Sequence, residues 1–295
     1  MSEEIFTQKE FVKELLPKRQ PNSHKGTYGA VLNIAGSVNY SGAAFLSSIA
    51  ALKIGAGYVT AACCKTVANS LRAVSPDIVL LPLEEKDGCI AVCEYRKILE
   101  ILPKYTAVSI GCGLSSMLYR QNNIEKFMEN FLAEIKDITT PIVIDADGLN
   151  IIAKLNITNL PQNTVLTPHT KELSRLLNVN TDEITADRTK YAKIAAKKYN
   201  AVVVLKGSQS VIIDGEKVFI NPTGNSALSK AGAGDVLTGI IAGLLAQGLS
   251  PFNSAVCGVY IHGLTGEAAS LELSEYSTNA SDLLTFLPKV VKNLL

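Results

Sequence analysis

The sequence predicts an α/β domain built on a mainly parallel sheet that helices cover on both faces. Short apolar runs rich in β-branched residues alternate with longer segments of helical periodicity, which is the pattern of successive βαβ units. Several of the short runs, such as Ala201–Leu205, are apolar throughout, and this is typical of strands buried on both faces. No repeat, low-complexity stretch or linker divides the chain, so we expect a single domain over residues 1–295.

The individual elements are assigned from these runs. The predicted strands of the parallel sheet are, in chain order, Ala30–Ala35, Tyr58–Cys63, Ile78–Leu81, Ala107–Ile110, Pro141–Asp145, Val165–Thr167 and Ala201–Leu205. The predicted helices lie at about Gly42–Ile54, Ile124–Ile135, Lys171–Leu177, Asp187–Lys198 and Val236–Ala246. Val211–Ile213 and Val218–Ile220 are joined through Asp214-Gly215, a favoured turn pair, and are predicted to form a small antiparallel hairpin.

The charge and hydropathy of the chain argue against nucleic acid and membrane as partners. The formal charge is only +1, so no large positive field is available for nucleic acid, whose binding depends on neutralising many phosphates. The longest apolar stretch, Val236–Leu249, is too short to cross a bilayer. The acidic start of the chain is not followed by an apolar segment, and the six scattered cysteines form no C-x-x-C pair. We therefore expect a cytoplasmic protein with reduced thiols, which binds neither nucleic acid nor membrane.

Polar and glycine residues gather where the predicted strands end. The strand ends are followed by Gly36-Ser37, Gly111-Cys112-Gly113, Asp145-Ala146-Asp147-Gly148, Thr167-Pro168-His169 and Lys206-Gly207-Ser208. In open α/β sheets, ligands bind outside the carboxyl edge of the strands. Turn chemistry accounts for part of this pattern, but its density favours a ligand site along the edge.

The common nucleotide fingerprints are absent, both G-x-G-x-x-G and the P-loop. The chain has instead Gly224-Asn225, and then Ala231-Gly232-Ala233-Gly234-Asp235 leading into an apolar helix. Glycines let a phosphate approach the backbone, and the start of a helix offers free N–H groups to it. Asp235 at the mouth of that site is a candidate general base, although a helix N-cap is the simpler role for an aspartate there.

Three other segments have both a binding and a plain structural interpretation. Lys206 to Ser210 are candidates to bind a phosphate or nucleotide, or to form a solvated turn before the hairpin. His169 is a candidate to contact a substrate or to cap the helix that begins near Lys171. Asp145 and Asp147 would suit Mg²⁺ beside a phosphate, and Asp147 would equally suit the start of a helix at Gly148. No dedicated protein metal site is predicted.

Taken in order, these segments resemble one family, the NAD(P)H-hydrate dehydratases, over about residues 20 to 290. The matching motifs are His24-Lys25-Gly26, Ala35-Gly36-Ser37, Tyr40-Ser41-Gly42-Ala43-Ala44, Lys53-Ile54-Gly55-Ala56-Gly57, Asp145 to Asn150, Thr167-Pro168-His169 with Glu172, Leu205-Lys206-Gly207, Gly224-Asn225, Gly232 to Gly239 and His262-Gly263. Two segments depart from the family pattern. In the first glycine turn, Cys112 stands where the family usually has proline, and Ser115 stands where it has a second glycine. Before the Gly-x-Gly-Asp turn the family often has Met-Ala-Thr-Gly, whereas this chain has Leu228-Ser229-Lys230-Ala231.

The resemblance implies a ribokinase-like fold and repair of hydrated nicotinamide cofactors. The S form of hydrated NADH or NADPH is phosphorylated by ADP or ATP with Mg²⁺, and loss of phosphate restores the cofactor. By position, Ala43, Gly113, His169 and Asp235 match residues that meet the hydrate, with Asp235 catalytic. Lys206, Gly207, Ser208, Gln209, Ser210 and Gly234 match the nucleotide site. The resemblance also implies a homo-oligomer, with a tetramer as the specific expectation. The family frequently has a fused epimerase domain, but only about 25 residues precede the match, so we expect no such domain here and a separate epimerase in the same pathway.

Two alternatives remain at this point. A small-molecule kinase of the same fold, of the hydroxyethylthiazole or pyridoxal type, shares the Gly-x-Gly-Asp turn, so that turn does not separate the two activities. A non-catalytic nucleotide-binding protein is the second alternative, and the retention of Asp235 argues against it. The segments Asp145–Asn150 and Thr167–His169 favour the dehydratase.

Overall fold

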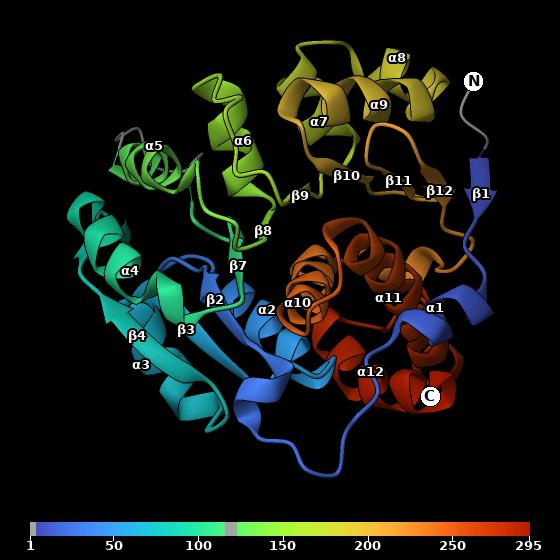
Figure 1. The fold of residues 1–295 in the computed structure, drawn as a ribbon, viewed down its shortest axis with the longest axis horizontal. Coiled ribbons are helices and arrows are strands. Elements are labelled where there is room, and N and C mark those ends of the chain that lie inside the picture. The colour runs from blue at the N-terminus through green and yellow to red at the C-terminus, as the bar shows by residue number, and fades with distance from the viewer. Residues whose placement is uncertain (1–3, 116–122) are drawn as a thin grey trace.

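A computed structural model describes residues 4–115 and 123–295, and its centre is one large sheet (Figure 1). Within those residues the sheet has ten strands in the order β1-β12-β11-β10-β9-β8-β7-β2-β3-β4. The strands are β1 (Glu4–Phe6), β2 (Ala30–Ile34), β3 (Tyr58–Cys64), β4 (Val79–Leu83), β7 (Ala107–Ile110), β8 (Ile142–Ile144), β9 (Thr164–Leu166), β10 (Val202–Leu205), β11 (Val211–Ile213) and β12 (Val218–Ile220). A separate pair consists of β5 (Glu85–Lys86) and β6 (Cys89–Ile90).

Helices cover both faces of this sheet. They are α1 (Lys9–Leu15), α2 (Ser41–Lys53), α3 (Lys65–Val74), α4 (Tyr95–Ile101), α5 (Asn123–Ile135), α6 (Asp147–Lys154), α7 (Thr170–Leu177), α8 (Thr181–Ala186), α9 (Arg188–Tyr199), α10 (Ala233–Ala246), α11 (Pro251–Leu273) and α12 (Ala280–Leu294). Short 3-10 turns lie at Lys25–Tyr28, Val92–Glu94, Leu102–Lys104 and Ser226–Leu228. No helix in the described ranges is long and apolar enough to cross a membrane.

The predicted α/β architecture is confirmed. All seven predicted parallel strands are present and pair in parallel, from β4 through β10, with bounds that differ from the prediction by one or two residues at most. The predicted hairpin is β11 and β12, which pair antiparallel. The edge strand β1 was not predicted, and it adds to β12 in parallel from the N-terminal end of the chain.

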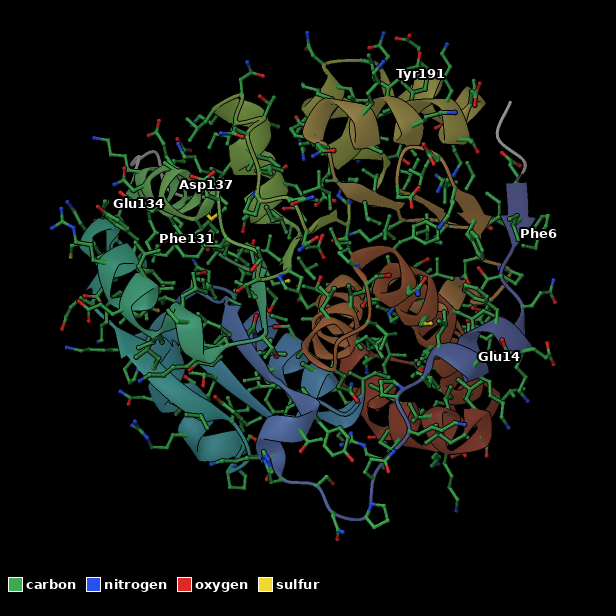
Figure 2. The ribbon with its side chains drawn as sticks, in the orientation of Figure 1. Phe6, Glu14, Phe131, Glu134, Asp137 and Tyr191 are labelled. Carbon is green, nitrogen blue, oxygen red and sulfur yellow. The ribbon has the colours of Figure 1, made fainter. Side chains whose placement is uncertain are left out.

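Each face of the sheet has its own core. Helices α4 to α9 bury one face, where Phe127 and Phe131 of α5 stack with ring centroids 6.1 Å apart. Helices α2, α10, α11 and α12 bury the other, and α1 from the start of the chain packs beside α11 and α12 (Figure 1). Figure 2 contrasts Phe131, inside the first core, with Phe6, which stands half-exposed on the edge strand β1. Full burial of a side chain such as Phe131 stabilises the fold by about 1.5–3 kcal/mol.

The order of the strands reverses at one place in the sheet. From β2 the strands follow one another through β3 to β4 at one edge, and from β7 they follow one another through β8 and β9 to β10 in the opposite direction, so the reversal lies between the neighbours β2 and β7. The last residues of four strands are in register, since Ile34, Ile110, Ile144 and Leu166 are successive partners. The loops after these strands therefore meet along one edge, at and beside the topological switch point where open α/β sheets bind ligands.

Candidate active site

The glycine turn ahead of α10 places a helix N-terminus at this edge. Gly232 has a left-handed backbone with φ 89° and is the N-cap of α10, with no side chain capping the helix. The prediction that the helix begins at Val236 was wrong, because Ala233, Gly234 and Asp235 already form its first turn. Asp235 is thus not the N-cap. The first N–H groups of α10 have neither helical partners nor a side-chain cap, which makes them suitable for an anion.

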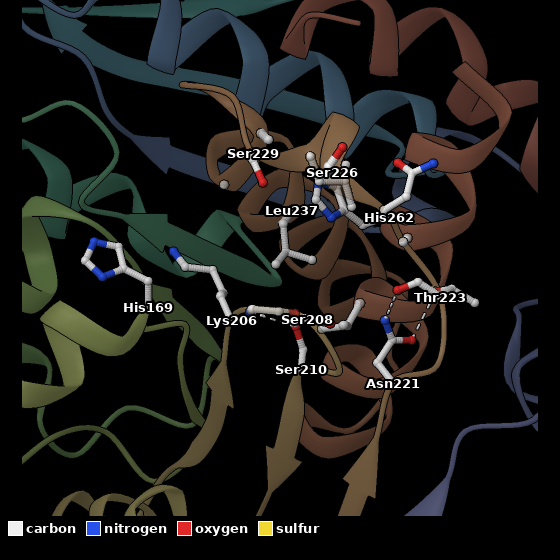
Figure 3. A pocket seen from close by; sticks show the side chains of 18 residues that line it. His169, Lys206, Ser208, Ser210, Asn221, Thr223, Ser226, Ser229, Leu237 and His262 are labelled. Atoms are coloured by element: carbon white, nitrogen blue, oxygen red, sulfur yellow. Dashed lines mark hydrogen bonds between the residues drawn. The ribbon is translucent and has the colours of Figure 1, made fainter. Parts of the chain in front are cut away.

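A cavity of about 640 Å³ opens beside this turn (Figure 3). Five of the six residues predicted for the nucleotide site line it: Lys206, Gly207, Ser208, Ser210 and Gly234. His169 lies at its edge. Gln209, the sixth, is not among the described residues that line the cavity, and neither are Ala43, Gly113 and Asp235.

The opposite wall of the cavity is polar. It contains Asn221, Thr223, Ser226, Ser229 and His262, which the sequence did not single out as nucleotide-binding. Asn221 donates through Nδ2 to the Thr223 carbonyl at 2.8 Å, and the Thr223 hydroxyl donates to Asn221 Oδ1 at 3.1 Å (Figure 3). In the sequence, only the family motifs Gly224-Asn225 and His262-Gly263 pointed to residues of this wall.

Lys206 reaches from the end of β10 to the start of α10. Its ammonium donates to Asp145 Oδ1 at 2.7 Å and lies 3.8 Å from Glu172 Oε2. A Cβ added at Gly234 would lie 3.5 Å from the same nitrogen, so the ammonium is next to the first turn of the helix. Burial lowers the pKa of Lys206, but the Asp145 and Glu172 carboxylates outweigh this effect and raise the pKa above its ordinary value. Lys206 is therefore charged at neutral pH, and Asp145 already compensates much of that charge.

His169 caps α7 as one of its two interpretations predicted. Its Nδ1 accepts hydrogen bonds from the backbone N–H groups of Lys171 and Glu172, at 3.0 and 3.2 Å, and Glu172 Oε2 accepts from the His169 backbone N–H at 2.7 Å. Burial and the Lys206 charge lower the pKa of His169 to about 4, so the ring is neutral at pH 7. Because Nδ1 is an acceptor, the proton of the neutral ring is on Nε2, which lies 3.5 Å from Glu172 Oε1.

Glu172 sits between this cap and Lys206. Its side chain is buried, and burial raises the pKa of Glu172 to about 7, with the Lys206 charge opposing the rise. Both protonation states are therefore populated near neutral pH. Glu172 was noticed in the sequence only as part of a family motif.

Ala43 and Gly113 lie against each other. A Cβ added to Gly113 would lie 2.7 Å from the Ala43 Cβ, and Gly113 has a left-handed backbone with φ 65°. Burial raises the pKa of Asp235 to about 6, and the negative charge of Asp145 adds to the rise, while Cys112, the residue before Gly113, and Lys206 oppose it. The Asp235 carboxylate is thus influenced both by the glycine turn that contains Gly113 and by the Lys206 ammonium.

The Asp145 and Asp147 pair does not form a metal site. Asp145 Oδ1 accepts from Lys206 Nζ, and Asp145 Oδ2 accepts from Thr238 Oγ1 at 2.6 Å. Asp147 is the first residue of α6, and its Oδ2 accepts from the Ser115 backbone N–H at 2.8 Å. In the described part of the chain no three His, Cys, Asp or Glu side chains are grouped to hold a metal ion. Ser115 keeps the left-handed backbone of the glycine it replaces, with φ 64°, and its hydroxyl bonds that of Ser37 at 2.5 Å.

Comparison with known proteins decides the family. A model of the NAD(P)H-hydrate dehydratase family matches residues 31–289, which is most of the chain. The chain belongs to the NAD(P)H-hydrate dehydratase family. The resemblance that the ordered motifs suggested is thereby confirmed.

Relatives of this dehydratase family match along nearly the whole chain. A bifunctional NAD(P)H-hydrate repair enzyme of Moorella thermoacetica is 40% identical over 95% of the chain and 52% of its own length. The chain spans about half the length of the first such relatives. An ADP-dependent (S)-NAD(P)H-hydrate dehydratase of Bacillus subtilis is 33% identical over 97% of the chain and 98% of its own length.

Solved structures of this family have the same fold. The ADP/ATP-dependent NAD(P)H-hydrate dehydratase of Bacillus subtilis, co-crystallised with ATP and Mg²⁺, superimposes with a TM-score of 0.84 at 32% identity, and the match covers 99% of both chains. The ribokinase-like fold predicted from the resemblance is confirmed.

Proposed function

We propose that this chain dehydrates the S form of hydrated NADH or NADPH at the expense of ADP or ATP, releasing the intact cofactor, phosphate, and AMP or ADP. The observation that carries the proposal is the position of Asp235. It is in the first turn of α10 next to Gly234, which lines the polar cavity with Lys206, and its carboxylate interacts with Cys112, the residue before Gly113 of the Ala43–Gly113 contact. A base in this place lies between a site for a hydroxyl compound and a site for a phosphate donor.

The nucleotide would occupy the 640 Å³ cavity. Its phosphates would meet the free N–H groups around Gly234 and the Lys206 ammonium, which together form an anion site. Ser208 and Ser210 would bind the nucleotide on the β10 side, and the polar wall around Asn221 would face its sugar and base. The hydrate would lie against Ala43 and Gly113, with His169 as the further contact that the family resemblance implies.

This placement determines the chemistry. Asp235 removes the proton of the ring hydroxyl, and the hydroxyl oxygen takes the terminal phosphoryl group of the nucleotide. The phosphate ester then breaks at its carbon–oxygen bond, and a proton leaves the neighbouring ring carbon, so that the ring double bond is restored. The elements of water thus leave as two protons, one from the hydroxyl and one from the ring carbon, and as an oxygen of inorganic phosphate.

Magnesium would enter with the nucleotide. Both Asp145 oxygens and one Asp147 oxygen are occupied by protein donors, so the described side chains do not supply a cage for the ion. Mg²⁺ usually keeps several waters and binds through substrate phosphates. We therefore treat the metal–nucleotide complex as the substrate, as the Bacillus subtilis crystals with ATP and Mg²⁺ suggest for that relative.

Mixing the protein with NADH hydrate tests the activity directly. With ADP or ATP and Mg²⁺ present, the NADH absorbance band should return, and it should not return without nucleotide. A protein that leaves the hydrate unchanged with both nucleotides but accumulates a phosphorylated vitamin-like alcohol would be a kinase instead.

The placement of the nucleotide predicts different effects at two neighbouring positions. Ser208 is exposed and lines the cavity, whereas Gln209 does not line it. Ser208→Glu should weaken ADP binding at least about tenfold, since it puts a carboxylate beside the phosphates, where a like charge costs on the order of 1 kcal/mol or more. Gln209→Glu adds the same charge one residue away and should weaken binding much less. Calorimetric titration with ADP measures both, and equal losses would place the nucleotide over Gln209 as well.

Gly207 is a poor position for such a test. Its backbone has φ 152°, and an added Cβ would lie 3.0 Å from the Arg188 guanidinium. Gly207→Val would therefore strain the turn as well as block the cavity, and a loss of ADP binding would not identify the contact.

We also propose a cytoplasmic homo-oligomer, with a tetramer as the specific form. All six cysteines are free, which suits a reducing compartment. Leu271 and Tyr276 are almost fully exposed, which supports a subunit contact near the end of α11. A monomer in sedimentation velocity would contradict the oligomer. Because the proposed reaction uses only the S form, a separate epimerase would supply that form from the other.

A further inference from the structure

A fully buried hydroxyl in α10 contacts the edge of the sheet. Thr238 interrupts an otherwise apolar helix, and its Oγ1 donates to Asp145 Oδ2 at 2.6 Å. Both side chains are inaccessible to solvent, with Thr238 at 0% and Asp145 at 1% exposure. The contact joins residues 93 positions apart in the chain. The proposed chemistry makes no use of this hydroxyl.

The Asp145 carboxylate connects three elements of the site. Its Oδ1 accepts from the Ala146 backbone N–H at 2.8 Å and from the Lys206 ammonium at 2.7 Å, while Oδ2 accepts from Thr238. It therefore holds the end of β8, the end of β10 and the first turns of α10 together. Thr238 lies three residues after Asp235, so the two side chains project from the same side of the helix one turn apart.

We propose that Thr238 and Asp145 are positioning residues that fix the Asp235 carboxylate and the Lys206 ammonium relative to each other. The proposal rests on the proposed function, in which the base and the cation act on one phosphoryl transfer. Such transfers depend mainly on the alignment of the reacting groups, and a misplacement of 1 Å can cost about 100-fold in rate. The Thr238 hydroxyl would thus act on turnover without touching either substrate.

The same contacts affect the pH range in which the Asp235 carboxylate is ionised and can accept a proton. Four charged or titratable groups act on this carboxylate: Asp145 and Asp147 from the segment after β8, Cys112 from the glycine turn after β7, and Lys206 from the end of β10, which itself contacts Glu172. After burial, the negative charge of Asp145 is the largest cause that raises the pKa of Asp235. Removing that charge lowers the pKa of Asp235, so the base form persists to lower pH.

Three substitutions of buried threonines test the positioning role. Thr238→Val keeps the shape of the side chain but removes the hydroxyl, and kcat should fall about 10- to 100-fold with little change in the KM for ADP. Thr238→Ser keeps the hydroxyl and should recover most of the lost kcat. Thr265→Val is the matched control, since Thr265 is equally buried in α11 and donates only to Ile261 of its own helix. It should lower Tm comparably and leave kcat unchanged.

Asp145→Asn tests the positioning role through the pH dependence of kcat, which the loss of a merely structural residue would not change. The plateau of kcat should fall, and the acid limb of its pH profile should move to lower pH. ADP affinity, which calorimetry measures without turnover, should stay the same or increase. Three results would overturn the proposal. The first is a Thr238→Val protein that folds and keeps wild-type kcat, and the second is an Asp145→Asn protein whose kcat falls at the same acidic pH as in the wild type. The third is ADP binding that is weakened more than tenfold in both variants. An inactive wild-type protein would count instead against the proposed function.

Discussion

Asp235→Asn should lower turnover roughly 10²–10⁴-fold, which is the range for loss of a general base. Asparagine has almost the same shape as aspartate but does not accept the proton of the ring hydroxyl. The N–H groups of the first turn of α10 are unchanged by the substitution, so ADP should still bind. Because Gly232 rather than Asp235 is the N-cap, the substitution removes no cap.

The stability of this variant should change in the opposite sense from its activity. The pKa of Asp235 is raised from 3.8 to about 6 in the folded protein, so ionisation of the carboxylate costs folding free energy as pH rises through 6. The asparagine side chain does not ionise, and at pH 8 the variant should therefore be more stable by about 3 kcal/mol, since each unit of the pKa shift corresponds to about 1.4 kcal/mol. In the wild type, turnover should fall as pH drops through about 6, where the base becomes protonated.

Asp182→Asn is a matched control for Asp235→Asn. Asp182 is also in the first turn of a helix, α8, but it is exposed and does not line the cavity. Its substitution should leave turnover unchanged. An Asp235→Asn protein that folds and keeps more than about a tenth of wild-type turnover would require a different base.

Lys206→Met should cause the largest loss of stability among the variants considered. It removes the cation between Asp145 and Glu172 and leaves two carboxylates in a largely buried place. Breaking one side of a buried pair costs about 3–5 kcal/mol of unfolding free energy. ADP binding should weaken too, because the ammonium beside Gly234 is lost.

The loss in Lys206→Met should depend on pH. The pKa of Glu172 is about 7 even with Lys206 present, and it rises further without that cation. Protonation of Glu172 removes the uncompensated charge, so the variant should lose less stability at pH 5.5 than at pH 8. Lys65→Met is the control, because Lys65 pairs with Glu84 at 2.6 Å on the surface, where an ion pair contributes about 0–1 kcal/mol. Chemical denaturation at both pH values measures the two differences. A loss in Lys206→Met no larger than in Lys65→Met would contradict the buried cluster.

The edge of the sheet was predictable because it depends on local patterns. Continuous apolar runs specify buried parallel strands, and the residues just after each run can be read directly from the sequence. Lys206, Ser208 and Ser210 follow the last predicted parallel strand and were candidates for that reason, whereas Gly234 was a candidate because of its glycine turn and the family resemblance. The structure puts all four residues around one cavity. Helix α10 begins at Ala233, three residues before the predicted start at Val236. Its first turn contains glycine and lacks the spaced apolar residues from which a helix is predicted, so the sequence did not show this turn as helical.

The contacts across the site were not predictable. Thr238, Asp145 and Lys206 are joined by hydrogen bonds that span 93 and 61 residues of sequence, and propensity or periodicity carries no information at that range. Thr238 was visible only as a polar interruption in an apolar run. Helix α11 was missed for a related reason, since it is buried against α10, α12 and the sheet and shows no polar stripe along most of its length.

The fate of the nucleotide's terminal phosphate tests the central claim most directly. The protein is given NADH hydrate and ADP labelled in the terminal phosphate, and NADH and label are followed together. A phosphoryl transfer followed by elimination predicts one labelled inorganic phosphate for each NADH restored, with no lasting phosphorylated product. NADH that returns without release of label, or label that stays on a stable ester, would contradict the account.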